Sequence, residues 1–138
     1  MSKPALKHIL SATLITSIII LTAGCFSFRK ENNDKNIAQL VEHFKKSGLM
    51  VDMVQSAMFD VIRAQDGVSL KIDGVDVQIF KYDTKEKVQN EKLEKIVKKG
   101  SITILGVDFS SKVNGSFIML NYKGHPDEQR LLEAFESF

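Results

Sequence analysis

Residues 68–79 constrain the fold more than any other part of the sequence. Residues of alternating polarity stand on both sides of Asp73-Gly74, a dipeptide preferred in the two-residue type I′ turn of a β-hairpin. Pairing across that turn separates the residues into an apolar face and a polar face. The apolar pairs are Ile72 with Val75, Leu70 with Val77 and Val68 with Ile79, and the polar pairs are Lys71 with Asp76 and Ser69 with Gln78. Such a hairpin needs a further layer over its apolar face.

Other segments carry the spacing of helices or the alternation of strands. Helices are predicted over residues 36–47, 83–99 and 126–138, the second opened by Asp83 with Glu86 and closed by Gly100. Strands are predicted over residues 49–54, 102–109 and 117–122, with a short helix after Ser56. We therefore expect an α+β fold, an antiparallel-dominated sheet of four or five strands with helices packed on it. The order of the middle elements also fits a ferredoxin-like βαββαβ sandwich with an extra strand and a C-terminal helix.

Residues 72–79 and 113–120 resemble each other. Each combines a turn dipeptide, Asp73-Gly74 or Asn114-Gly115, with alternating apolar residues ahead of a predicted helix. Either a strand-turn-strand-helix unit is duplicated, or two hairpins of similar length have converged on one pattern. Convergence is the simpler interpretation, and both stay open here.

The N-terminus has the layout of an export signal. Residues 1–8 contain Lys3 and Lys7 and no acidic residue, and residues 9–21 are apolar or small hydroxyl residues. A basic region followed by an apolar region is typical of a signal peptide. The apolar stretch is slightly short for a free-standing transmembrane helix, which needs about 20 apolar residues.

Leu21-Thr22-Ala23-Gly24-Cys25 resembles the bacterial lipobox, with Thr22 where leucine is usual. In lipoproteins the cysteine sulfur receives diacylglycerol, and the signal is then cleaved just before that cysteine, here between Gly24 and Cys25. Two acyl chains give stable membrane anchoring, whereas one chain binds only marginally. The resemblance implies a cleaved signal peptide over residues 1–24 and lipid on Cys25. Secretion with a free thiol and an uncleaved signal anchor are the alternatives.

The remaining chain has the size of one domain. Residues 25–35, polar and without periodicity, predict the lipidated cysteine and a short polar tether, and residues 36–138 predict a single α+β domain. The tether reaches at most about 35 Å. We therefore expect an extracytoplasmic domain close to a bacterial membrane, either the outer face of the cytoplasmic membrane or the outer membrane.

The basic excess of the whole sequence belongs to the signal. The chain has 19 Lys and Arg against 17 Asp and Glu, and loss of Lys3 and Lys7 leaves 17 against 17. A neutral domain argues against nucleic acid as a partner, because phosphate binding needs clustered, uncompensated basic residues. With Cys25 lipidated, no cysteine remains for disulfides or thiolate chemistry.

No catalytic, metal or cofactor motif is visible in the mature part. Neither His43 nor His125 belongs to a zinc motif of the His-Glu-x-x-His type. The serines lack a nucleophile-elbow setting and the glycines are isolated: Ser110, Ser111, Ser116, Gly74, Gly106 and Gly115. Carboxylates could still be assembled in space, and the candidates are Asp52, Asp60, Asp73, Asp76 and Asp108.

The methionines Met50, Met53, Met58 and Met119 are predicted to pack in the core, with an adaptable apolar groove or a Cu(I) site as alternatives. We therefore predict a non-enzymatic, lipid-anchored envelope protein without a cofactor, acting as a protein-interaction or accessory module at the membrane surface. A small-ligand binding lipoprotein with an apolar pocket lined by Met and Phe side chains is the alternative. The sequence leaves the oligomeric state open.

Overall fold

The computed structural model describes residues 29–138. Its elements follow one another along the chain as three α-helices, six strands and one short 3-10 helix. They are α1 (Ile37–Lys46), β1 (Val51–Ser56), η1 (Asp60–Ile62), β2 (Asp66–Ile72), β3 (Val75–Lys81), α2 (Lys87–Lys99), β4 (Ser101–Ile104), β5 (Val107–Asn114), β6 (Phe117–Leu120) and α3 (Glu128–Ser137).

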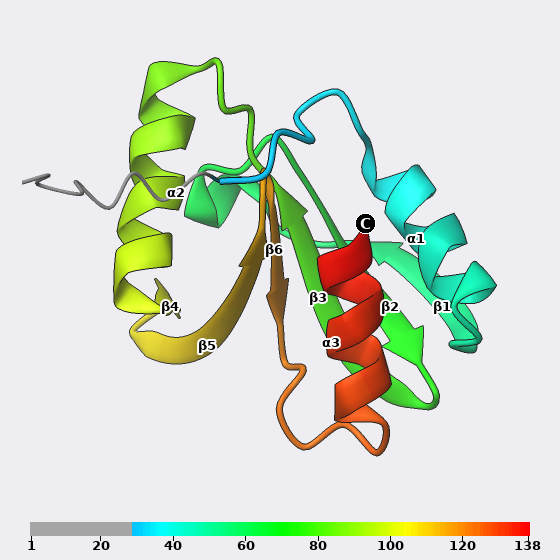
Figure 1. The fold of residues 1–138 in the computed structure, drawn as a ribbon. Helices are drawn as coiled ribbons and strands as arrows, with labels where there is room; N and C mark the ends of the chain where they lie inside the picture. The colour runs from blue at the N-terminus through cyan, green and yellow to red at the C-terminus, as the bar shows by residue number, and fades with distance from the viewer. Residues whose placement is uncertain (1–28) are drawn as a thin grey trace, which may run out of the picture.

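All strands belong to one sheet in the order β1-β2-β3-β6-β5-β4 (Figure 1). Each neighbouring pair is antiparallel. The predicted α+β fold with an antiparallel sheet is thus confirmed, with six strands in place of four or five. The ferredoxin-like arrangement is not found, because in a split βαβ unit one other strand lies between the two strands that the helix connects. Here β1 and β2, connected through η1, are direct neighbours, and β3 and β4, connected through α2, are separated by the two strands β6 and β5.

Helices cover both faces of the sheet. On one face, α1 and α3 pack over β2, β3 and β6 around Leu40, Phe44 and Phe135. On the other face, α2 and η1 pack over β3, β6 and β4 around Leu93, Ile96 and Ile62. All four residues of β6 are buried and alternate between the two clusters, as expected of a central strand.

The hairpin β2–β3 forms as predicted. All five expected pairs are present, and the sheet register extends to Asp66 and Lys81. Asp73 and Gly74 both have positive φ, 48° and 81°, which the type I′ turn requires. Lys71 and Asp76 form an ion pair of 3.3 Å on the polar face.

The strand predicted over residues 102–109 is wrong, because the chain reverses within it. Leu105 and Gly106 have φ of 49° and 82° and form the turn between β4 and β5. A leucine rarely adopts positive φ, so the apolar run Ile104-Leu105-Gly106-Val107 gives little sign of a turn. Leu105 is 81% exposed, which shows that the turn projects into solvent.

The two similar hairpins turn in different frames. The first turn consists of Asp73 and Gly74, whereas the second consists of Gly115 and Ser116, one residue later in the repeated pattern. A shift of one residue moves every side chain to the opposite face. Val77 accordingly packs against α1 and α3, while its counterpart Ile118 packs against α2. This difference favours convergence over duplication.

The second helix starts later than predicted. Glu86 caps α2, its carboxylate accepting hydrogen bonds from the backbone N–H groups of Val88 and Gln89. Only Leu93 and Ile96 of the predicted apolar stripe are buried, and Val88 and Val97 are exposed. The end of β3 supplies the missing apolar surface on this face through Phe80 and Tyr82, both buried.

Candidate functional site

The residues that precede the first helix lie against the domain. We call residues 29–36 the anchor segment, because they connect the predicted lipid site to α1. The segment crosses one end of the sheet, beside the end of β3 and the turn between β5 and β6 (Figure 1). Cys25 and Gly24, with the rest of the lipobox, lie outside the described residues.

Asn32 is the centre of this contact and is only 1% exposed. Its side-chain oxygen accepts hydrogen bonds from the backbone N–H of Ser116 at 2.8 Å and from the Ser116 hydroxyl at 3.0 Å. Its side-chain nitrogen donates to the carbonyl of Asn114 at 3.2 Å. Asn32 therefore satisfies the buried polar groups of the β5–β6 turn, which would otherwise lack partners.

Gly115 makes room for Asn32. A Cβ atom at position 115 would lie 2.1 Å from the Asn32 side-chain oxygen and 2.5 Å from the Lys30 carbonyl. Gly115 also has a positive φ of 59°, which disfavours any residue with a side chain. The turn glycine predicted from the sequence thus has a second role, because its lack of a side chain lets the anchor segment pack against the turn.

The segment also supplies hydrogen-bond acceptors to a buried lysine. Lys81 at the end of β3 is 9% exposed, and its ammonium donates to the carbonyls of Asn33, at 2.8 Å, and of Lys35. A buried ammonium is costly unless it is hydrogen-bonded. The hydrogen bonds therefore stabilise the buried Lys81 side chain and also hold the anchor segment on the domain.

Further contacts hold the segment to α2 and α3. The Arg29 guanidinium donates to the side-chain oxygen of Asn90. Asn33 donates to Asp83 at 3.1 Å. Hydrogen bonds from the Lys85 backbone N–H and then from Asn33 hold the pKa of Asp83 below its usual value, so this carboxylate stays ionised. The Lys35 ammonium donates to the C-terminal Phe138 carbonyl and lies 4.3 Å from the centre of its ring.

The structure thus places most of the predicted tether on the domain. Residues 29–35, predicted as part of a short polar tether, contact β3, α2, α3 and the β5–β6 turn through the hydrogen bonds just described. The polar side chains of these residues form specific hydrogen bonds with the domain. Only residues 25–28 of the predicted tether precede the described part of the chain.

Strand β1 is an exposed edge of the sheet. Five of its six residues are exposed, and its sequence, VDMVQS, contains neither lysine nor proline. Natural edge strands are usually protected by charged residues, above all lysine, by proline or by a bulge. In β1 the charge of Asp52 and the irregularity between Val51 and Met53 lie at the start of the strand, and residues 53–56 have no such protection.

The backbone of β1 has free groups that point away from the sheet. The Ala57 N–H donates to the Gly67 carbonyl, just after the Ser56–Val68 pair. Hydrogen bonds alternate along an antiparallel ladder, so Ser56 and Val54 direct their N–H and C=O groups to solvent. Gln55 between them faces β2 with its backbone groups.

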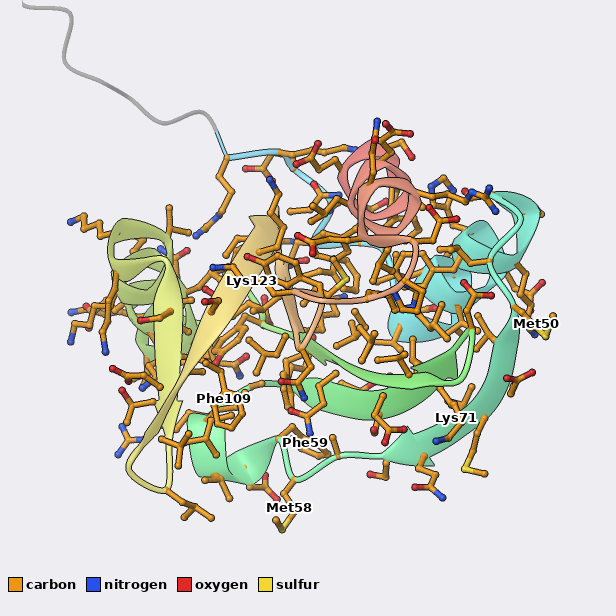
Figure 2. All side chains as sticks on the ribbon, turned by 90° about the horizontal axis from the view of Figure 1, so that it is seen from below. Met50, Met58, Phe59, Lys71, Phe109 and Lys123 are labelled. Atoms are coloured by element: carbon orange, nitrogen blue, oxygen red, sulfur yellow. The ribbon has the colours of Figure 1, made fainter. Side chains whose placement is uncertain are left out.

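Three of the methionines are not in the core, contrary to the prediction. Met50, Met53 and Met58 are 64%, 46% and 75% exposed, whereas Met119 is fully buried in β6. Figure 2 shows Met50 and Met58 at the periphery of the molecule. The reason is strand order: β1 is an edge, and its flanks lack the cover that neighbouring strands and helices give to β6.

The predicted chemical candidates have structural roles or lie apart. His125 is buried and bonds the Ile72 carbonyl at 2.9 Å through Nε2, while Nδ1 accepts from the Asp127 N–H. His43 joins α1 to the Ala134 carbonyl of α3 at 2.9 Å. Within residues 29–138, no group of three or more His, Cys, Asp or Glu side chains could hold a metal ion.

The candidate carboxylates are not brought together. Asp52, Asp60, Asp73, Asp76 and Asp108 stand on β1, η1, the β2–β3 turn, β3 and β5. Asp73 accepts a hydrogen bond from the Met50 backbone N–H. Hydrogen bonds from Thr103 and then Lys99 hold the pKa of Asp108 below its usual value, which keeps it ionised near neutral pH.

The hollows on the described surface are open. A depression of about 470 Å³ lies between α1 and the C-terminus, with Gln39, Glu42, His43 and Phe138 in its lining. Another, of about 400 Å³, lies along the acidic side of α3. Neither of these two hollows has a methionine in its lining, so neither matches the expected apolar Met- and Phe-lined pocket.

Comparisons with protein-family models, with curated proteins and with solved structures found no match to this chain. Among residues 29–138, no helix has both the length and the apolar character needed to cross a bilayer.

Proposed function

We propose that this chain is a lipid-anchored bacterial envelope protein, held to the membrane by diacylglyceryl-Cys25, whose domain binds another protein through the free edge of β1. The lipobox-like residues support the anchor, and the anchor segment gives it a fixed point on the domain. The observation that carries the binding role is the exposed edge of β1, whose residues 53–56 have no charge, proline or bulge.

The partner that fits this edge is an extended segment of another envelope protein. The outward N–H and C=O groups of Val54 and Ser56 can pair with such a segment by strand addition. Met53 and Val54, 46% and 52% exposed, lie on opposite faces of β1 and flank the added strand. Methionine suits such a surface, because its flexible side chain adapts to partners of different shape.

The lipid is tested by growth with labelled palmitate. The wild-type chain is expected to carry the label, and Cys25→Ala to lose it, because the thioether requires the cysteine sulfur. Cys25→Ser serves as the isosteric control and is also expected to be unlabelled. Absence of label from the wild-type chain, or equal labelling of Cys25→Ala, would contradict the anchor.

The protein contact is tested by photo-crosslinking in growing cells. A photoreactive amino acid at Met53 is expected to give a discrete adduct, and the same amino acid at Lys98, on the exposed side of α2, serves as the control position. The crosslinked residue of the partner, identified by mass spectrometry, is expected to lie in an extended segment.

A second substitution makes this test specific for the backbone edge. Val54→Pro removes an N–H that points to solvent, so it weakens strand addition and leaves the β1–β2 ladder intact. Val54→Thr is the matched control, β-branched and with its N–H retained. The adduct should disappear with proline and persist with threonine. An adduct insensitive to proline, or none above the Lys98 control, would refute the docking edge, and an adduct between two copies would identify the partner as this chain itself.

A further inference from the structure

We infer that the domain stands on the bilayer in one orientation, with the end that binds the anchor segment facing the lipid headgroups and the end containing the β2–β3 turn facing away. This inference rests on the proposed lipid at Cys25. Beyond the lipid attachment, the inference specifies the surface of the domain that faces the membrane.

The reach of the chain limits the distance from lipid to domain. Cys25 precedes Arg29 by four residues, which span at most about 14 Å even when fully extended. Arg29 is bonded to Asn90, and Asn32 three residues later is buried in the β5–β6 turn. The lipid is therefore linked by a short stretch of chain to residues that are docked at one place on the domain.

The anchor segment lies at one particular end of the sheet. β3 runs from the Asp73-Gly74 turn to Lys81, which binds the anchor segment. Its seven residues extend about 23 Å, at 3.3 Å for each residue. The far end of the sheet is thus farther from Arg29 than the link to Cys25 can reach. Figure 1 shows the anchor segment at one end of the molecule and the β2–β3 turn and the loop before α3 at the other.

The charged residues around the anchor segment suit contact with headgroups. They are exposed and of mixed charge: Lys30, Glu31, Asp34, Lys85, Glu86 and Lys87. The exposed apolar side chains at this end, Met58, Val61 and Val88, belong to η1 with the residues before it and to the first turn of α2, beside the segment. The surface that the anchor segment itself brings to the bilayer is therefore polar and nearly neutral, and the edge of β1 stays free for a protein.

The test measures how close each end lies to the bilayer. The lipidated full-length chain is purified from membranes and placed in phosphatidylethanolamine and phosphatidylglycerol vesicles that contain a headgroup-nitroxide lipid. A fluorophore is attached to a single new thiol, in Lys85→Cys at the near end or in Lys123→Cys at the far end. Both lysines are exposed, and Figure 2 looks onto the end that contains Lys123. Because Cys25 carries lipid, the new thiol is the one reactive site.

The nitroxide should quench the fluorophore at position 85 more strongly than the one at position 123. Insertion of about ten Gly and Ser residues after Phe28 leaves the domain unchanged and lengthens the link flexibly, so it should abolish the difference. Equal quenching of the two ends in the unmodified chain, or stronger quenching at position 123, would overturn the orientation while palmitate labelling still supported the lipid. Failure of the wild-type chain to take up palmitate would overturn the anchor itself, and this orientation with it.

Discussion

Removal of residues 135–138 is expected to leave the domain unfolded at room temperature. Phe135 and Phe138 are 0% and 6% exposed, and the Phe138 ring meets Phe117 edge to face at 5.4 Å. Loss of each buried phenylalanine costs about 3–5 kcal/mol, so the two together approach the whole stability of a small domain, about 5–15 kcal/mol. The Asn114 side chain also loses its hydrogen bond to the Phe135 carbonyl.

Thermal and urea unfolding followed by circular dichroism measures this effect. Phe135→Ala alone should lower the free energy of unfolding by about 3–5 kcal/mol. Glu133→Ala, on the exposed side of the same helix, should stay within about 0.5 kcal/mol of the wild type. A truncated chain that still unfolds cooperatively at nearly the wild-type temperature would show that the C-terminal aromatic residues are not part of the core.

Replacement of Asn32 by alanine is expected to lower the free energy of unfolding by about 2–4 kcal/mol, since each buried polar group left without a partner costs about 1–3 kcal/mol. The groups concerned are the Ser116 N–H and the Asn114 carbonyl. The same change should release the anchor segment, so that proteases cut after Lys30 or Lys35 before the domain unfolds.

Urea unfolding and limited proteolysis of the variant test both consequences. Asn33→Ala is the matched control, because Asn33 lies in the same segment but is partly exposed and bonds Asp83 and Thr84 near the surface. Its effect should be smaller, about 1 kcal/mol. If Asn32→Ala were no less stable than Asn33→Ala and equally resistant to proteolysis, the anchor segment would not be docked through Asn32.

The parts of the fold that local chemistry specifies could be predicted from the sequence. The β2–β3 hairpin has the expected turn and pairs. A two-residue turn with positive φ at both positions allows only one register between the two strands. The first helix begins after Asn36 and ends before Gly48 for equally local reasons, a capping box with Gln39 and a glycine at φ 83°.

Features that depend on distant contacts could not be predicted. Met50, Met53 and Met58 have the composition of core residues, and only the place of β1 at the edge exposes them. The Leu105-Gly106 turn interrupts an apolar run because β4 folds back on β5. The candidate attachment site was predicted at Cys25 alone, and the polar residues that follow give no local sign that they dock.

The sequence by itself determined an α+β domain, a hairpin with its register and three helices with approximate ends, and it placed the lipobox-like residues just ahead of that domain. Only the tertiary structure decided that residues 29–36 belong to the domain and that β1 is a free edge. The physical reason is the range of the interactions. Turns and caps join residues a few positions apart, whereas Asn32 bonds Ser116 across 84 positions and becomes buried only when β5 and β6 have formed their turn.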